Sequence, residues 1–211
     1  MPDTFSRYEI YTSVGSIYCY KDTGVLKNRF NIRDNDLLKK IESDYYSVRQ
    51  AELLQNPISG NMTPSHLCRI HKYFFGKLYA FAGHYRREDI MKGKTRFLPY
   101  SHIPDKLSAC LLQLRNETFL TELTLEDYFK RAAYYLAELN YIHPFREGNG
   151  RATREFMRYL FMKSGYGVNW SLVEKDDLLD AMELSVYEPD ALIPLLSQCI
   201  YPLPQENIEQ K

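Results

Sequence analysis

Twelve consecutive residues between two helical patterns carry most of the side chains in this chain that could do chemistry. They are residues 143–154, with the sequence His-Pro-Phe-Arg-Glu-Gly-Asn-Gly-Arg-Ala-Thr-Arg. Glycines at 148 and 150 allow positive φ and let backbone N–H groups approach a ligand without interference from a Cβ. The helix that follows presents unpaired first-turn N–H groups and the positive end of its dipole at the same place. The segment therefore predicts an anion-binding loop.

Four charged or titratable side chains in this segment suit phosphate chemistry. Arg151 and Arg154 are three residues apart on one helical turn, so we expect them to share a face and reach one polyphosphate. A neutral imidazole at His143 suits general-base work on a hydroxyl, which contributes about 10²–10⁴-fold to a rate. A carboxylate at Glu147 suits Mg²⁺, which takes one or two protein oxygens beside phosphates and water. Together these groups indicate nucleotide transfer.

Each feature also has an ordinary structural explanation. A His-Pro step after a helix can simply end that helix, and Gly-Asn-Gly alone is most often a turn. All of them occurring together, in order and between two helices, favours an active site over unrelated turns.

The segment resembles the complete active-site motif of the Fic family, H-P-F-x-(D/E)-G-N-G-R-x-x-R, at every fixed position. The related Doc-type kinases have alanine, asparagine and lysine where this chain has Gly148, Asn149 and Gly150, so their reversed phosphate orientation is not expected. The resemblance implies an enzyme that transfers AMP from ATP to a Tyr, Ser or Thr hydroxyl of a target protein and releases pyrophosphate.

The resemblance and the side-chain chemistry give each motif residue a role. His143 is the expected general base, and Glu147 is expected to hold Mg²⁺. Phe145 is expected to lie buried under the loop. The phosphate-binding residues are expected to be the Gly148-Asn149-Gly150 nest, with the Asn149 amide facing the α-phosphate, and Arg151 and Arg154 on the β- and γ-phosphates.

A second segment, residues 85–98, is expected to contact the target protein. Two short extended runs around Lys92-Gly93-Lys94 predict a β-hairpin. In Fic proteins a hairpin at this place is the flap that holds a target segment by strand addition. The candidate target contacts are Ile90, Met91, Lys92 and Thr95. The alternative is a hairpin whose basic side chains are merely solvated.

Composition excludes several other classes of function. The chain has 211 residues, 45% of them hydrophobic, which suffices for one domain or slightly more. Its 27 basic and 27 acidic residues cancel, so we expect no direct nucleic-acid binding and no attraction to anionic membranes. Four scattered cysteines indicate free thiols in a reducing compartment. No signal segment or membrane-length apolar run is visible, so a cytoplasmic location is expected.

Helical patterns account for most of the remaining chain. Asp34 or Asp36 is expected to cap a helix running to about Leu54. Thr63-Pro64 is expected to start a second helix that Gly83 ends. The predicted apolar stripes are Leu37, Leu38, Ile41, Tyr45 and Val48 in the first helix, and Leu67, Ile70, Phe74, Leu78 and Phe81 in the second. His71 is expected at the surface or the edge of the core, without a chemical role.

Further helices are expected on both sides of the motif. One covers residues 103–114, and another begins at Thr124 with a near capping box and runs to the motif. Gly165 is expected to end the helix after the motif, and Ser171 to cap the next. Trp170 is expected to anchor the core. The final helices are placed around residues 172–184 and 190–199, followed by a frayed tail at 202–204.

The predicted fold is all-α, with about six to eight helices and one small β-hairpin flap. The resemblance is good over residues 60–185 and loose elsewhere. We divide the chain into an N-terminal arm and first helix (1–58), a Fic core domain (59–200, with the flap at about 85–98 and the active-site loop at 143–154) and a C-terminal tail (201–211).

Many Fic proteins carry an inhibitory helix with the pattern (S/T)-x-x-x-E-(G/N). Here only Thr118 has a glutamate four residues on, Glu122, and Leu123 follows it, so we interpret this match as a coincidence. A separate small antitoxin-like protein is the expected inhibitor of this toxin-like enzyme. An unrestrained enzyme, or an effector delivered into another cell, is the alternative.

Three other functions stay open at this point. They are transfer of UMP or phosphocholine, removal of AMP from a modified protein, and a catalytically silent module that binds nucleotide and a partner. The intact set of motif residues argues against the silent module. The sequence does not specify the target, the base preference or the oligomeric state.

Overall fold

Helices form the framework that carries the active-site loop. The computed structural model describes residues 15–21, 23–93 and 95–204. Its helices are α1 (Asn35–Gln55), α2 (Pro64–Phe75), α3 (Ile103–Asn116), α4 (Leu125–Ile142), α5 (Asn149–Lys163), α6 (Lys175–Leu184) and α7 (Ile193–Cys199). Short 3₁₀ turns lie at Tyr100–His102, Thr118–Leu120, Trp170–Leu172 and Pro189–Leu192. The predicted all-α class and number of helices are confirmed.

The described residues form two small antiparallel sheets. Strands β1 (Met91–Lys92) and β2 (Thr95–Arg96) make the predicted hairpin, whose turn residue Lys94 lies outside the described residues. Strands β3 (Tyr166–Val168) and β4 (Ile200–Pro202) make a second pair, with Gly167 opposite Tyr201. The sequence prediction missed this second sheet, and residues 202 and 203 are paired rather than frayed, since Leu203 N–H also donates to Gly165 O at 2.9 Å.

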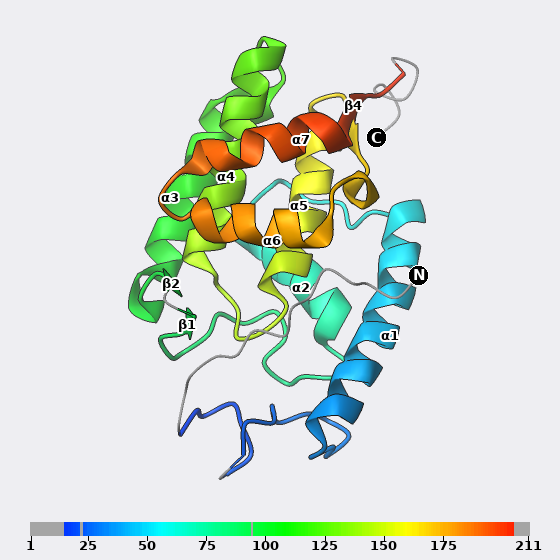
Figure 1. The fold of residues 1–211 in the computed structure, drawn as a ribbon, viewed down its shortest axis with the longest axis vertical. Coiled ribbons are helices and arrows are strands. Elements are labelled where there is room, and N and C mark those ends of the chain that lie inside the picture. The colour runs from blue at the N-terminus through cyan, green and yellow to red at the C-terminus, as the bar shows by residue number, and fades with distance from the viewer. Residues whose placement is uncertain (1–14, 22, 94, 205–211) are drawn as a thin grey trace.

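The two helices that flank the motif lie at the centre of the core. Helix α4 contacts α3, α5 and α7, and α5 also contacts α2, while α6 and α7 cross one face of this group (Figure 1). The apolar residues that give both central helices their helical spacing are buried, namely Ala132, Tyr135, Leu136 and Leu139 on α4 and Phe156, Leu160 and Phe161 on α5. None of the helices in the described ranges is both long and apolar enough to cross a membrane.

Helix α1 begins as predicted but buries a different face. The Asp34 carboxylate accepts hydrogen bonds from the N–H groups of Asp36 and Leu37, at 2.9 and 3.0 Å. Leu37 and Val48 are 49% and 60% exposed, however, so the predicted stripe was wrong at these two positions. The buried face carries Leu38, Glu42, Tyr46 and Leu53. Because the carboxylate of Glu42 lies in the middle of that face, the helical spacing of the buried residues cannot be found from apolar residues alone.

Two predicted helix boundaries were wrong, and Trp170 is less buried than expected. Helix α2 ends at Phe75 rather than near Gly83, because the chain then turns, with the N–H groups of Leu78 and Tyr79 both donating to Phe75 O at 2.9 Å. Helix α6 has Glu174, not Ser171, at its N-cap. Trp170 lies in a 3₁₀ turn and is only half-buried, with its ring 6.4 Å from that of Phe161.

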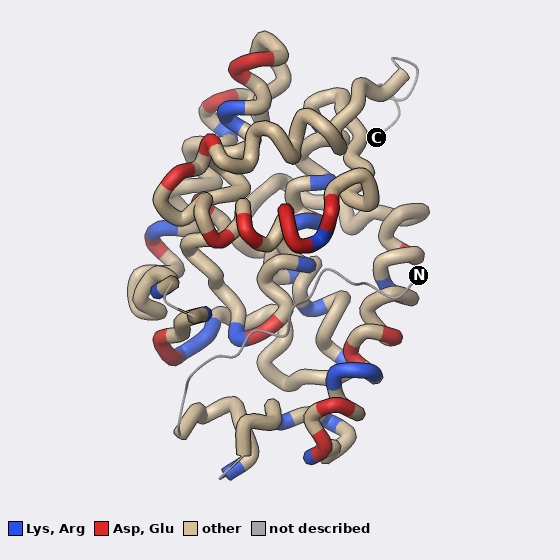
Figure 2. Tube along the Cα trace, in the orientation of Figure 1, with Lys and Arg blue, Asp and Glu red and all other residues tan. Residues whose placement is uncertain are grey.

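Charges are mixed over most of the fold. Basic and acidic residues are both spread along the chain, and acidic residues predominate on α6 (Figure 2). This mixture agrees with a formal net charge of zero.

The cap of α4 gives a test of the fold. The Thr124 hydroxyl accepts a hydrogen bond from Asp127 N–H at 3.3 Å. Replacing Thr124 by Ala should lower the free energy of unfolding by about 1 kcal/mol, because the N–H group loses its acceptor. Urea denaturation measures the change. Thr121→Ala is the matched control, since that hydroxyl donates only to Thr118 O. An equal loss in both variants would contradict the assignment of the cap.

Candidate active site

The active-site loop is a buried turn between α4 and α5. Helix α4 ends at Ile142, and His143 takes a left-handed conformation with φ of 45° while its N–H still donates to Leu139 O. Gly148 is also left-handed, with φ of 78°, and starts α5 as its N-cap. A Cβ at Gly148 would lie 2.3 Å from Phe75 Cε2. The turn thus requires glycine at 148 for its conformation and for the approach of α2.

Phe145 and Asn149 close the loop from inside. Phe145 is fully buried, as predicted. Its backbone N–H donates to Asn149 Oδ1 at 2.7 Å, and Asn149 Nδ2 donates to Phe145 O at 2.8 Å. Both polar groups of the Asn149 amide thus hold the loop backbone. Its contact with the α-phosphate stays a prediction, for which Nδ2 has a second N–H.

His71 supports the loop from α2. Its ring stacks on Phe145 with centroids 3.8 Å apart. Its Nδ1 accepts from Gly83 N–H at 2.8 Å, and its Nε2 lies 2.8 Å from Glu147 O. A backbone N–H can only donate and a carbonyl can only accept, so Nε2 carries the proton. Burial lowers the pKa of His71 to about 3, which keeps the ring neutral.

The expected position of His71 at the surface or core edge was wrong. The residue is completely buried. Its spacing of four residues from Leu67 and three from Phe74 could have shown this, because both of those side chains face the core.

Arg86 joins the hairpin segment to the same loop, and sequence reasoning missed it. Its Nε donates to His143 O at 2.8 Å, and its Nη2 donates to Leu98 O and, at 3.4 Å, to Ile142 O. Its own N–H donates to Pro144 O at 2.8 Å. Burial lowers the pKa of this guanidinium to about 10, so it remains charged at neutral pH. Its Nη1 also donates to Glu88 O at 2.8 Å, so five carbonyl groups near the base of the hairpin and the loop find donors on one residue.

Arg146, at the variable position of the motif, makes a second link to the hairpin segment. Its Nε donates to Glu88 Oε1 at 2.9 Å. Glu88 also accepts from the Ser16 hydroxyl at 2.7 Å, so the N-terminal arm, the hairpin base and the loop meet at one carboxylate.

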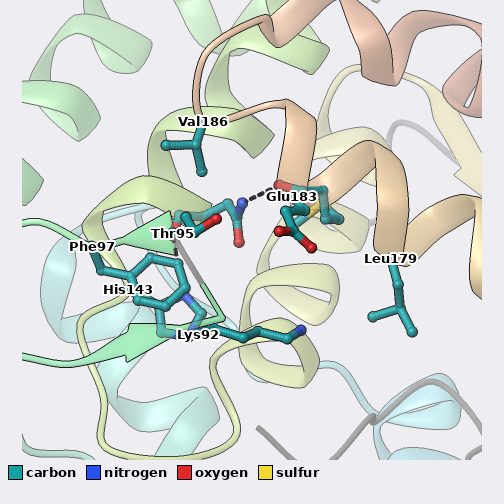
Figure 3. A pocket seen from close by; sticks show the side chains of 9 residues that line it. Lys92, Thr95, Phe97, His143, Leu179, Glu183 and Val186 are labelled. Atoms are coloured by element: carbon teal, nitrogen blue, oxygen red, sulfur yellow. Dashed lines mark hydrogen bonds between the residues drawn. The ribbon is translucent and has the colours of Figure 1, made fainter. Parts of the chain in front are cut away.

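His143 faces a pocket between the hairpin and α6. Its ring stacks on Phe97 at 3.7 Å, and its Nδ1 lies 3.0 Å from Asn140 O. In the neutral ring Nδ1 must donate to that carbonyl, which puts the lone pair on Nε2. The pocket is lined by Lys92, Thr95, Phe97, Asn140, His143, Leu179, Met182, Glu183 and Val186, and Lys92 extends from the hairpin toward α6 (Figure 3).

The four predicted target contacts do not lie alike. Lys92 and Thr95 line the pocket beside His143. Ile90 and Thr95 are 6% and 5% exposed, whereas Met91 and Lys92 are half-buried. A target segment laid along the hairpin would therefore meet the side chains of Met91 and Lys92 first.

The two motif arginines also lie differently, although the sequence placed them on one face. Arg151 is 3% exposed, and its Nη2 lies 2.5 Å from Glu42 Oε1 on α1. Burial opposes the charge of this guanidinium, but Glu42 and Glu147 outweigh that effect and raise the pKa of Arg151. Arg154 is half-buried, and its Nη1 would lie 3.2 Å from a Cβ at Gly150. Arg154 thus lies beside Gly150, whereas the guanidinium of Arg151 pairs with Glu42.

Glu147 is suited to hold a metal ion. Its Oε1 accepts from Gly148 N–H at 2.9 Å and lies 3.5 Å from Arg151 Nη2. Within the described ranges, no three His, Cys, Asp or Glu side chains come together as a metal site. Mg²⁺ fits this arrangement, because it is commonly bound by one or two carboxylates together with substrate phosphates.

Comparison with known proteins agrees with this geometry. Residues 61–161 match the sequence model of the Fic/DOC family. Protein adenylyltransferase VbhT of Bartonella schoenbuchensis is 37% identical over 88% of this chain, which spans 39% of VbhT. The probable protein adenylyltransferase Fic of Salmonella typhimurium is 32% identical over 72% of this chain and 76% of that protein. The expected enzyme class is thus confirmed at the level of the family.

Solved structures of similar fold carry nucleotides. BepC of Bartonella tribocorum, with bound AMPPNP, superposes with a TM-score of 0.81 at 26% identity, over 89% of this chain and 97% of that one. An N-terminal Fic domain from Bartonella quintana, with bound ADP, gives a TM-score of 0.82 at 24% identity over 90% and 97%. On its motif, its loop geometry and these relatives, the chain belongs to the Fic/DOC family.

Proposed function

We propose that this protein transfers AMP from ATP to a Tyr, Ser or Thr hydroxyl of a target protein and releases pyrophosphate. The observation that carries the proposal is the position of His143. Its backbone carbonyl accepts a hydrogen bond from Arg86, and its side chain lines the pocket beside the hairpin. The names of the curated relatives and the nucleotides in similar structures support it.

The phosphates of ATP are proposed to bind at the start of α5. There the N–H groups of Asn149 and Gly150 and the helix dipole offer positive charge, while Gly148, whose N–H donates to Glu147 Oε1, gives the nest its left-handed turn. Arg154, beside Gly150, would hold the β- and γ-phosphates and the departing pyrophosphate. Arg151 could contact a phosphate only while it also pairs with Glu42. We therefore propose that Arg154 makes the main contacts with the β- and γ-phosphates.

Glu147 is proposed to hold Mg²⁺, which when bound would neutralise phosphate charge as it develops. The chain's own chemical step belongs to His143. Its Nε2 would take the proton of the target hydroxyl as the oxygen attacks the α-phosphorus in line and the bond to pyrophosphate breaks. Stacking on Phe97 and the contact with Asn140 O fix the ring for this transfer.

The target segment is proposed to lie along the hairpin by strand addition. Lys92 and Thr95 support this, because they bring the hairpin to the pocket in front of His143. The apolar side chains of α6 that line the same pocket suit the nucleoside half of ATP.

A small antitoxin-like protein is proposed as the inhibitor, in trans. It would supply a glutamate to Arg154 and so compete with the γ-phosphate. The described chain supports this, since the match at Thr118 and Glu122 begins in the 3₁₀ turn Thr118–Leu120, whose residues are left-handed, and does not form a helix at the site. We place the enzyme in the cytoplasm, where its four free cysteines would stay reduced.

The decisive experiment follows label from nucleotide to protein. Purified protein is incubated with Mg²⁺, α-labelled ATP and a lysate, beside a His143→Ala variant. We expect the variant to lose transfer by about 10²-fold or more, while its affinity for ATP changes by less than about twofold. Loss of transfer and binding together would refute the assignment of the base. Label from UTP or CDP-choline but not from ATP would change the donor.

The glycine nest gives a second test of the site. Gly148→Ala introduces a Cβ into the ring of Phe75 at a positive φ. Backbone strain of about 1–3 kcal/mol should weaken ADP binding by about tenfold, at about 1.4 kcal/mol per tenfold. Calorimetry on the folded variant measures this. Gly24→Ala, where nothing lies within 4 Å of the new Cβ, should bind as the wild type does. Unchanged affinity in Gly148→Ala would remove the nest from the phosphate site.

The neutral His71 makes the fold sensitive to acid. Its pKa is about 3 when folded and near 6.5 when unfolded, so below pH 6.5 the unfolded chain takes up a proton that the folded chain does not. Stability should therefore fall with pH between 6.5 and 3, by about 1.4 kcal/mol per unit from this group. Urea unfolding at pH 7.5 and 5.5 should show a steeper loss in the wild type than in His71→Gln. Parallel losses would contradict the buried neutral ring.

A further inference from the structure

Glu42 is a buried acid of α1 that lies outside the motif and contacts its first arginine. The residue is 2% exposed. Its Oε1 lies 2.5 Å from Arg151 Nη2, and its Oε2 accepts from the Tyr79 hydroxyl. A carboxylate so far from water is costly unless charged and hydrogen-bonding partners compensate it. Here both oxygens have such partners.

Arg151 lies between two carboxylates but is not shared equally. The same Nη2 is 2.5 Å from Glu42 Oε1 and 3.5 Å from Glu147 Oε1. The guanidinium lies over the rings of Phe75, at 4.6 Å, and Tyr46, at 5.3 Å. Glu42 and Tyr46 on α1 and Phe75 on α2 thus surround the guanidinium. Glu147 receives only the longer, weaker contact.

The unequal contact matters because Glu147 is the carboxylate that the proposed function assigns to Mg²⁺. An arginine and a divalent cation compete for the lone pairs of one carboxylate. With its nearest counter-ion removed, the buried Arg151 would have Glu147 as its only described acidic partner. A full ion pair there would oppose metal binding at Glu147.

We propose that Glu42 is a positioning residue for the metal–nucleotide site, because it holds Arg151 away from Glu147 and leaves that carboxylate able to bind the cation. The proposal rests on the proposed function only in taking Glu147 as the metal ligand. An inhibitory contact between Glu42 and Arg151 would have the opposite effect on nucleotide binding. If Glu42 kept Arg151 from phosphate, removing its charge would improve nucleotide binding.

The test is Glu42→Gln, which keeps size and hydrogen bonding but removes the charge. Mn²⁺ binding is measured by electron paramagnetic resonance in the presence of AMPPNP, and AMPPNP binding is measured separately in EDTA. We expect Mn²⁺ affinity to fall by about tenfold, as is typical when a residue that orients a metal-binding side chain is replaced. AMPPNP affinity without metal should stay within about twofold. The transfer reaction should need more Mg²⁺ and recover at saturating metal.

The control is Glu52→Gln on the same helix. Glu52 pairs with Arg49 at 2.7 Å, and its side chain is 45% exposed. The variant therefore loses an ion pair of α1 but no contact with the active-site loop. It should bind Mn²⁺ as the wild type does. A general weakening of α1 would instead lower metal binding in both variants.

Glu42→Asp is a second variant that tests the proposal if Glu42→Gln does not fold. It retains the charge but reaches less far toward Arg151, and it should give a smaller loss of Mn²⁺ affinity in the same direction. Unchanged or tighter Mn²⁺ binding in folded Glu42→Gln, or in Glu42→Asp where the former is unfolded, overturns the proposal. If the wild type itself binds no Mn²⁺ with AMPPNP, the proposed function falls as well, so the two failures are distinguishable.

Discussion

The structure depends on hydrogen bonds to the carbonyl groups of one short loop. Between α4 and α5 the chain leaves helical geometry, and its peptide groups lose the partners that a helix would give them. Arg86, His71 and Asn149 replace those partners at His143 O, Glu147 O and Phe145 O. Each comes from a different element, so the loop keeps its shape only when the hairpin segment, α2 and α5 are all in place.

This arrangement explains why so many polar groups of the site are buried. His143, Arg146, Glu147, Asn149 and Arg151 are all at most 9% exposed. Several of them hold the loop, and the motif residues fall into two groups. Asn149 and Phe145 maintain the loop backbone, whereas His143 lines the pocket beside the hairpin and Arg154 is half-buried beside Gly150.

The sequence indicated the all-α class, the two central helices and the place of the hairpin, because each rests on local patterns of apolar spacing, caps and turns. It also brought His143, Glu147 and the glycines together, because they share one turn. It missed the β3–β4 pair, Arg86 and Glu42. These depend on contacts between distant segments, and a charged residue in a core position gives no apolar signal. The backbone hydrogen bonds of the Asn149 amide were not predicted for a similar reason, since its partners become visible only once the loop is built.

The segment that matches the family, residues 61–161, does not contain all of the charged residues of the site. Helix α1 lies before it and supplies the acid nearest to Arg151. A unit cut to the matching segment would expose the ring of Phe75 and leave a buried cation without its closest counter-charge. The segment that matches the family and the segment that holds this ion pair therefore have different boundaries, and the second includes α1 from its N-cap at Asp34.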